Sequence, residues 1–434
     1  MGSLKFLHLS DIHFKRETVD SHYDLDKVLR AKLEQALRDH VAAHGQLSGL
    51  LISGDIAFGG AVGDYEVADL WISTICEIIG INWLNAFMVP GNHDIDRTVT
   101  KGGSFMDMCH RDLRGCPPSE IDAKVRGFIE IDKETILRPL HNYNHFSSRY
   151  SCSTSAASGF TWTDNETYRF DGGIRLSLHG INTALISDQN DHAETGRLAC
   201  TSYQSAIVPD DDEIYMVLAH HPPDWIRDGD VLKRSLNDVA SIQLFGHKHE
   251  PGQFIIDNKS LVVAAGAVHP ERQESQWIPS FNILELDIVE HNLTPQLQIK
   301  TFKYRWSDED RAFTPKYYNG SPYRDNHLEI KARPNPLRSE KPNQTMSMTE
   351  ERHERSLSTV NPERYLAYKY IMLALVYKVR IATDLGLLNE NDLPLEESFF
   401  NEIVKRGKAQ GKLKELWIRV AAHDANMKDI ENPF

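Results

Sequence analysis

Five short groups of metal-binding residue types recur in the first 250 residues, and each directly follows an apolar run. In chain order the candidate ligands are Asp11, His13, Asp55, Asn92, His220, His247 and His249. All of them offer oxygen or imidazole nitrogen and none is a thiolate, which favours Mn, Fe or Zn in an open catalytic site over a closed structural zinc. Seven ligands are too many for one ion. They predict two ions that share a bridging ligand, an arrangement that clamps a phosphoryl group and lowers the pKa of a bridging water.

The elements that must position these residues are strands. The runs that precede the groups are "KFLHLSD", "GLLISGD", "NAFMVPGNHD", "EIYMVLAHHPPD" and "SIQLFGHKHE". Because they are almost continuously apolar, they are typical of strands covered on both faces. Helical patterns over residues 24–43 and 64–79 alternate with them. This alternation predicts an α/β layered fold, in which ligands gather outside the carboxyl ends of the strands.

The rest of the chain divides by composition. Apolar runs between His249 and Trp306 predict further strands, which we assign to a second sheet. We therefore expect a catalytic domain over 1–306, with an insert at 97–173 that is long enough to wall one side of the ions. Residues 307–360 are polar and rich in proline, which predicts a linker or arm. Residues 361–434 regain helical periodicity and predict a small helical unit, with an apolar stripe at Leu366, Tyr370, Leu373 and Tyr377.

Charge and cysteine usage restrict the partners. The net charge is −14, from 48 basic and 62 acidic residues, so duplex DNA is disfavoured as a partner without a local basic face. The five cysteines show no CxxC pairing, which indicates reduced, unpaired thiols. No signal-peptide pattern opens the sequence, and no apolar run reaches the roughly 20 residues of a membrane span. These features predict a cytoplasmic location and no membrane partner.

The ordered series of motifs resembles the calcineurin-like metallophosphoesterase superfamily. The series is D-x-H at 11–13, G-D at 54–55, G-N-H-D at 91–94, H-x-P at 220–222 and G-H-x-H at 246–249. The resemblance implies a four-layer αββα sandwich in which a metal-bridging hydroxide attacks phosphorus directly. It further implies that Asp11, His13 and His249 hold the first ion, that Asn92, His220 and His247 hold the second, and that Asp55 bridges both.

Two neighbouring residues gain catalytic roles from the same resemblance. His93 is similar to the family histidine that protonates the leaving oxygen, and Asp94 or Asp96 could orient its imidazole. The choice of His220 over His221 as a ligand rests on the H-x-P spacing. His221 is left as a substrate contact or a packing residue.

The segment "GRLACTSYQ" at 196–204 resembles the cyclic-nucleotide-phosphodiesterase-like branch of the superfamily. We therefore expect a phosphodiesterase acting on a nucleotide or cyclic nucleotide. A DNA or RNA nuclease and a protein phosphatase of the same superfamily stay open, as does a scaffold acting through the C-terminal helices. Nucleic acid remains a possible partner. Residues 361–434 match no part of the superfamily, and they suggest a protein partner or self-association.

Overall fold

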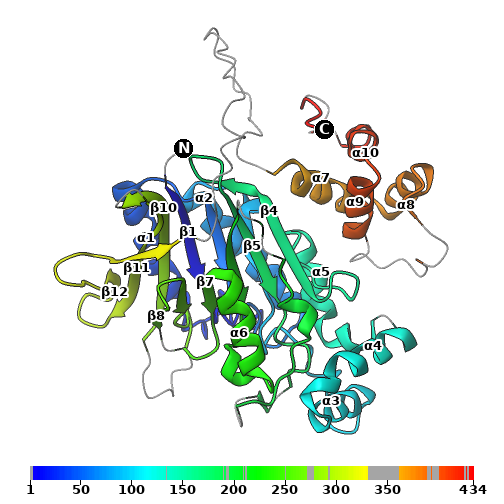
Figure 1. Ribbon diagram of the computed structural model, residues 1–434, viewed down its shortest axis with the longest axis horizontal. Coiled ribbons are helices and arrows are strands. Elements are labelled where there is room, and N and C mark those ends of the chain that lie inside the picture. Colours follow the sequence, from blue (N-terminus) through cyan, green and yellow to red (C-terminus); the bar gives the residue numbers. More distant parts are fainter. Residues whose placement is uncertain are drawn as a thin grey trace.

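Two β-sheets carry the polar groups, with helices outside them (Figure 1). The computed structural model describes residues 3–132, 134–188, 190–191, 195–208, 210, 213–249, 251–270, 278–291, 294–330, 361–388, 392, 400–424, 427 and 430–434. The architecture is the expected four-layer αββα sandwich with additional C-terminal helices.

The first sheet has seven strands. In spatial order they are β12 (Ala312–Pro315), β11 (Thr294–Ser307), β10 (Ser280–His291), β1 (Leu4–Leu9), β2 (Gly49–Ile52) and β3 (Ala86–Met88), while β13 (Arg324–Glu329) also pairs with β11. Strands β1, β2 and β3 run parallel. Their carboxyl ends therefore meet at one edge of the sheet, directly before the first three polar groups.

The second sheet has six strands. In spatial order they are β4 (Thr161–Arg169), β5 (Arg175–Ile181), β6 (Glu213–Ala219), β7 (Ala240–Phe245), β9 (Ser260–Ala264) and β8 (Gly252–Ile256). Strands β5, β6, β7 and β9 are parallel. Every residue of β6 is buried, as the continuous apolar run predicts for a strand covered on both faces.

Two predictions about the later strands are wrong. We assigned the strands after His249 to a second sheet, but β10 and β11 join the first sheet, where Phe6 of β1 pairs antiparallel with Leu284 of β10. We also expected a linker from residue 307. Instead β12 and β13 extend the first sheet, because Asn326 and Leu328 of β13 alternate inward and are buried. The remainder of the predicted linker, from residue 331 to 360, lies outside the described residues.

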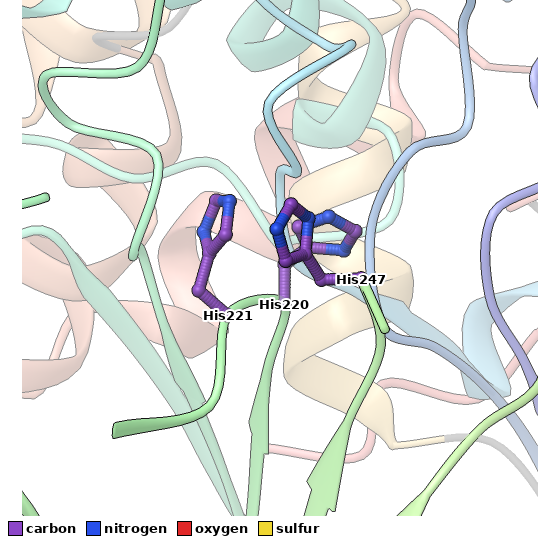
Figure 2. A group of neighbouring side chains, drawn as sticks. All are labelled: His220, His221 and His247. Atoms are coloured by element: carbon purple, nitrogen blue, oxygen red, sulfur yellow. The ribbon is translucent and has the colours of Figure 1, made fainter. Parts of the chain in front are cut away.

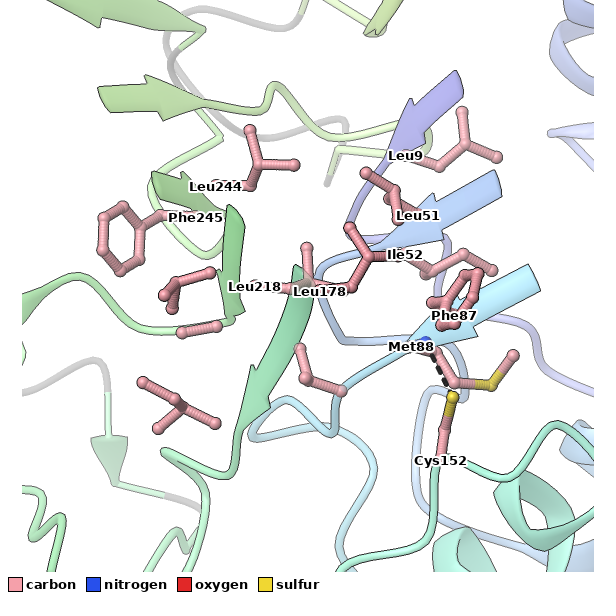
Figure 3. Packing of buried hydrophobic residues seen from close by; sticks show 14 of the residues in the cluster. Leu9, Leu51, Ile52, Phe87, Met88, Cys152, Leu178, Leu218, Leu244 and Phe245 are labelled. Atoms are coloured by element: carbon pink, nitrogen blue, oxygen red, sulfur yellow. Dashed lines mark hydrogen bonds between the residues drawn. The ribbon is translucent and has the colours of Figure 1, made fainter. Parts of the chain in front are cut away.

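The core lies between the two sheets. Figure 3 shows Leu9, Leu51 and Ile52 of the first sheet and Leu178, Leu218 and Leu244 of the second among the buried apolar side chains. All six of these side chains are at most 2% exposed. Burial of this apolar surface is the main favourable contribution to folding, and it brings the carboxyl ends of both sheets to the same edge.

Helices cover the outer faces and build the insert. They are α1 (Lys27–His44), α2 (Val62–Ile79), α3 (Phe105–Gly115), α4 (Ile121–Ile131), α5 (His141–Ser148) and α6 (Gly229–Val239). Helix α1 contacts β12 of the first sheet and packs against α2, and α6 contacts β7 of the second sheet. The insert contains α3, α4 and α5, and α3 and α4 lie at the end of the molecule toward which β1 points (Figure 1). That the insert walls one side of the ions stays a prediction.

The C-terminal unit consists of α7 (Pro362–Ile371), α8 (Leu375–Asp384), α9 (Phe400–Ala409) and α10 (Leu413–Ala421). Asn361 caps α7 by accepting hydrogen bonds from the backbone N–H groups of Glu363 and Arg364. The predicted apolar stripe is only partly exposed. Leu366 and Tyr370 are buried in the unit's own core, whereas Tyr377 is 41% exposed. Across the described residues, no helix is long and apolar enough to cross a membrane.

Candidate metal centre

All five polar groups meet at the common edge of the two sheets. The loops after β1 and β2 are hydrogen-bonded to each other, since the backbone N–H of His13 donates to the Asp55 carbonyl at 3.0 Å. The loops after β6 and β7 are joined in the same way by the Gly246 N–H and the His220 carbonyl at 3.0 Å. His220 Nδ1 donates to the Ser53 carbonyl at 2.7 Å and so connects the two sheets.

Most of the predicted ligands have an unusual backbone conformation. Positive φ angles of 53° to 69° occur at Asp11, His13, Asp55, His247 and His249. Side chains other than glycine, asparagine and aspartate seldom adopt this left-handed region, which costs roughly 1 kcal/mol or more for each residue. Such strain clusters at functional sites, because it aims side chains in directions that an extended strand end does not reach.

A close approach explains the glycine of the G-N-H-D group. A Cβ on Gly91 would lie 2.1 Å from Asp55 Oδ1. Only glycine lets the loop after β3 come this near to the carboxylate of the loop after β2. The backbone N–H of His93 then donates to the same oxygen at 2.7 Å.

The first cluster of side chains joins Asp11, His13, Asp55 and His249. His249 Nε2 lies 3.2 Å from Asp11 Oδ1, and His13 Nε2 lies 3.2 Å from Asp55 Oδ2. His13 Nδ1 faces the carbonyl of His269 at 3.4 Å. Because a carbonyl only accepts, that contact places the proton on Nδ1 and leaves Nε2 with a lone pair.

The second cluster surrounds the amide of Asn92. Three imidazole nitrogens approach Asn92 Oδ1: His220 Nε2 at 3.1 Å, His221 Nε2 at 3.2 Å and His247 Nδ1 at 3.0 Å. Figure 2 shows these three histidines side by side, with His220 and His221 on adjacent positions after β6. Asn92, His220 and His221 are fully buried, and His247 is 6% exposed.

Asp55 belongs to both clusters. Its Oδ2 lies 3.2 Å from His13 Nε2 of the first cluster and 3.4 Å from His220 Nε2 of the second. Asp11 also reaches both sides, because the backbone N–H of His247 donates to Asp11 Oδ2 at 3.3 Å, but the contacts of Asp55 on both sides are to imidazole side chains. A carboxylate at this position can neutralise charge between two cations.

The spacing of the donor atoms fits two metal ions. Ligand atoms bound at about 2.1 Å to one ion lie roughly 3 Å from each other. The measured separations between donors in both clusters are 3.0 to 3.4 Å. Three imidazoles around one amide oxygen exceed what its two lone pairs can accept as hydrogen bonds. A shared cation accounts for this convergence.

The charges of the centre are coupled. Burial alone would raise the pKa of Asp55, but His220, His93 and His13 hold that pKa well below its ordinary value. Burial likewise opposes protonation of His220, but Asp55 outweighs it and raises the pKa of His220 to about 9. Both aspartates, Asp11 and Asp55, are therefore anionic at neutral pH. They present negative charge to a cation.

His93 lies beside the first cluster. Its ring centroid is 4.6 Å from that of His13, and its Nδ1 donates to the carbonyl of Phe58 at 2.8 Å. The backbone carbonyl therefore fixes the tautomer that carries its proton on Nδ1, and Nε2 is the ring nitrogen without this partner. Burial lowers the pKa of His93 to about 4, against the opposing effect of Asp55.

Asp94 has a different role from the one we expected. Its carboxylate accepts hydrogen bonds from the backbone N–H groups of Ile56, Ala57 and Gly91 and from the hydroxyl of Tyr65. These contacts join the loop after β2 to the loop after β3. The group seen to orient the His93 imidazole is the Phe58 carbonyl, so Asp94 supports the loops. Asp96 accepts from the backbone and hydroxyl of Thr98.

Sequence reasoning gave too little weight to His221 and missed Phe58 and Arg97. His221 Nδ1 faces the hydroxyl of Thr183 at 2.9 Å, and a hydroxyl can donate or accept. The tautomer of His221 is therefore not fixed, in contrast to that of His220, whose partner is a carbonyl. In the sequence, His220 and His221 are equally good candidates for a ligand. Only the groups that contact their Nδ1 atoms, the Ser53 carbonyl and the Thr183 hydroxyl, distinguish them. No motif marks Phe58 or Arg97, which reach the site through loop geometry.

The comparisons with known proteins match the part of the chain that contains the polar groups. A family model described as calcineurin-like phosphoesterase matches residues 4–251. An uncharacterised metallophosphoesterase-like protein, YydB, of Bacillus subtilis (strain 168) is 24% identical over 339 residues. That match covers 75% of this chain and 66% of the relative, so the chain spans slightly less than two thirds of its length.

Among solved structures, a dimetal phosphatase from Danio rerio is 9% identical, with a TM-score of 0.39. The match covers 76% of this chain and all of that one. A 5'-nucleotidase from Candida albicans SC5314 is 14% identical over 69% of this chain and 52% of that one, with a TM-score of 0.31. Neither likeness is close enough to assign an activity.

Proposed function

This chain belongs to the calcineurin-like phosphoesterase family, and from that membership we propose that it is a dinuclear metal-dependent hydrolase of phosphodiesters. The substrate class we propose is a nucleotide or cyclic nucleotide diester. The observation that carries the proposal is the position of Asp55, whose carboxylate contacts His13 on one side and His220 on the other. Such a link is what two ions with one bridging ligand require.

The ligand sets follow from the two clusters. Asp11, His13 and His249 would hold one ion, Asn92, His220 and His247 the other, and Asp55 both. His221 is a fourth candidate beside the second ion, because its Nε2 also reaches Asn92 Oδ1. We retain His220 as the ligand, since the Ser53 carbonyl keeps one proton on Nδ1, so that Nε2 can bind an ion once it releases the other. Two such ions supply an acidified water and positive charge that stabilises the phosphoryl group.

The remaining chemistry belongs to the chain itself. The Phe58 carbonyl holds His93 Nδ1–H, so Nε2 is the nitrogen that would carry a proton to the leaving oxygen, once the negative charge of the bound phosphoester offsets the burial that keeps the ring neutral. A diester with an alkoxide leaving group gains more from this proton than an aryl monoester does. The sandwich of sheets fixes both clusters on strand ends, which keeps the reacting groups aligned. The mixed set of carboxylate, amide and imidazole suits Mn, Fe or Zn.

A metal-dependent activity screen tests the proposal. Purified chain loaded with Mn, Fe or Zn is assayed with bis-p-nitrophenyl phosphate and with p-nitrophenyl phosphate under identical conditions. We expect kcat/KM for the diester to equal or exceed that for the monoester. A strong monoester preference would identify a phosphatase instead. Salt-sensitive cleavage of long DNA at low enzyme concentration would identify a nuclease.

A further inference from the structure

Arg97 lies against the ring of His93, but the two facing nitrogen atoms are both hydrogen-bond donors. Its terminal nitrogen is 3.2 Å from His93 Nδ1, yet that nitrogen already donates its proton to the Phe58 carbonyl at 2.8 Å. A guanidinium has only donors. It therefore cannot donate to a nitrogen that is itself protonated, and the contact leaves a donor of Arg97 unsatisfied.

The same side of the site holds a second cation. Lys15 lies with its Nζ 5.1 Å from the centroid of the Phe58 ring, and that ring is 5.3 Å from the ring of His93. We call Lys15, Phe58 and Arg97 the cationic rim. Arg97 contacts the His93 ring directly, and Lys15 is linked to that ring through Phe58, which lies between them in this series of contacts.

Neither cation of the rim has a carboxylate partner among the described residues. Two other arginines of the insert are neutralised: Arg114 pairs with Asp188 at 2.7 Å and Arg149 with Asp69 at 2.6 Å. The Nε of Arg97 is buried and has no hydrogen-bond partner in the described part of the chain. In a protein with 62 acidic and 48 basic residues, two unpaired cations beside one histidine are a concentration of positive charge that a ligand can neutralise.

We propose that the cationic rim binds a negative charge carried by the leaving group of the substrate. The inference rests on the proposed function, in which His93 protonates the leaving oxygen, because that role places the leaving group beside the rim. The substrate class is then a phosphoester whose departing alcohol bears its own phosphate or carboxylate. Arg97 contacts this anion with its planar donors, Lys15 adds charge, and Phe58 provides an apolar wall.

A pair of synthetic diesters tests the rim without knowledge of the natural substrate. Methyl p-carboxyphenyl phosphate and methyl p-carbamoylphenyl phosphate differ in one charge on the departing phenol. In either reaction water adds to phosphorus, the P–O bond to the aryl oxygen breaks, and the proton passes to the phenol, which leaves methyl phosphate. We expect the metal-loaded wild type to prefer the carboxylate by roughly tenfold or more in kcat/KM.

Variants of the rim should remove this preference selectively. Arg97→Gln and Lys15→Gln are each expected to reduce the ratio of kcat/KM for the carboxylate diester to that for the neutral diester, and the double variant to bring this ratio close to one, with metal content retained. Arg97→Lys should keep part of the preference, since the charge stays but the planar donors are lost. Arg111→Gln is the matched control, because Arg111 is 63% exposed and already paired with Asp107 at 2.8 Å.

The outcomes separate the two proposals. Hydrolysis of both diesters at equal rates by the wild type would overturn the role of the rim alone. A carboxylate preference that survives in the double variant would do the same. If the metal-loaded protein hydrolyses neither diester nor bis-p-nitrophenyl phosphate, the proposed function fails, and the inference that rests on it fails too.

Discussion

The guanidinium of Arg364 lies 4.0 Å from the centroid of the Phe87 ring, in the middle of β3. This contact joins the first helix of the C-terminal unit to the strand that leads to Asn92 and His93. Arg364 also donates to the carbonyls of Ala86 and Tyr150, and it is only 6% exposed. The helical unit is thus attached to the catalytic body by a buried cation.

Removing this cation should destabilise the whole chain. In Arg364→Met the apolar stem is kept, but buried carbonyls and the Asp164 carboxylate, 3.6 Å away, lose their partner. We expect a loss of ~3 kcal/mol in the free energy of unfolding, measured by urea denaturation. The control Arg419→Met removes an exposed pair with Asp384 and should cost below ~1 kcal/mol. Equal stability of the two variants would contradict a role for Arg364 in attaching the unit.

Truncation extends the same test. A chain that ends at residue 345 lacks Arg364 but keeps every proposed ligand. We expect it to fold and to bind metal, with a stability no higher than that of Arg364→Met, since the Trp83 ring also loses its contact with Tyr368 at 4.1 Å. Insoluble protein would show that the helices complete the core of the catalytic body.

Asp55→Asn tests the bridge between the two clusters. The amide keeps the shape of the carboxylate and can still accept from the His93 N–H, but it removes the charge that both ions share. We expect metal content, measured by elemental analysis, to fall sharply, and kcat/KM to fall by at least roughly 10²-fold. Full metal content with normal turnover would show that the two clusters do not share a ligand.

His93→Ala separates chemistry from metal binding. We expect two ions to remain bound while kcat falls by roughly 10²-fold or more, because the proton donor is lost and no ligand is. His145→Ala, on the exposed face of α5, is the control and should leave both quantities unchanged. If His93→Ala loses metal, the ring is a ligand of the first ion.

Metal affinity should increase with pH. The pKa of His220 is raised to about 9, chiefly because Asp55 outweighs the effect of burial. The metal-free protein therefore holds a proton on His220 at neutral pH, and binding must release it. We expect the affinity for Zn to rise between pH 6 and pH 8 by up to about tenfold per pH unit for each proton released. Calorimetric titrations in two buffers of different ionisation enthalpy measure that release, and an affinity independent of pH would contradict it.

Asp191 predicts a different pH dependence, in stability. Burial raises the pKa of Asp191 to about 7, against a hydrogen bond from the Asp188 backbone N–H, while the charge of the Asp188 carboxylate adds to the rise and Ser187 and Arg114 oppose it. Because the pKa is higher in the folded state than in the unfolded chain, the folded protein binds this proton more tightly. Its contribution to stability is complete below about pH 4 and is lost as the pH rises through 7.

The substitution Asp191→Asn imitates the protonated acid. We expect the variant to be more stable than the wild type at pH 8, by ~1 kcal/mol or more in the free energy of unfolding. The difference should shrink at pH 5. Asp112→Asn, at a carboxylate that is 51% exposed, should show no such trend. A constant difference between pH 5 and pH 8 would show that Asp191 does not titrate in this range.

The site was more predictable from the sequence than the order of the strands. Asp11, Asp55 and His247 directly follow buried runs, and parallel strands bring their carboxyl ends to one edge. Periodicity reports which residues are buried but not which strand pairs with which, so the position of β10 beside β1 was missed. The role of Asp94 was missed for a related reason. A carboxylate that accepts from backbone N–H groups of a distant loop looks the same in sequence as one that touches a histidine.

The left-handed backbone at the ligand positions destabilises the fold that holds the site. His13 and His249, with φ of 54° at each, hold a conformation that asparagine or glycine adopts more readily. Replacing His13 or His249 by asparagine or glycine would therefore lower the backbone cost of this conformation. The proposed ions would offset this cost, because an ion that binds only the folded state stabilises it.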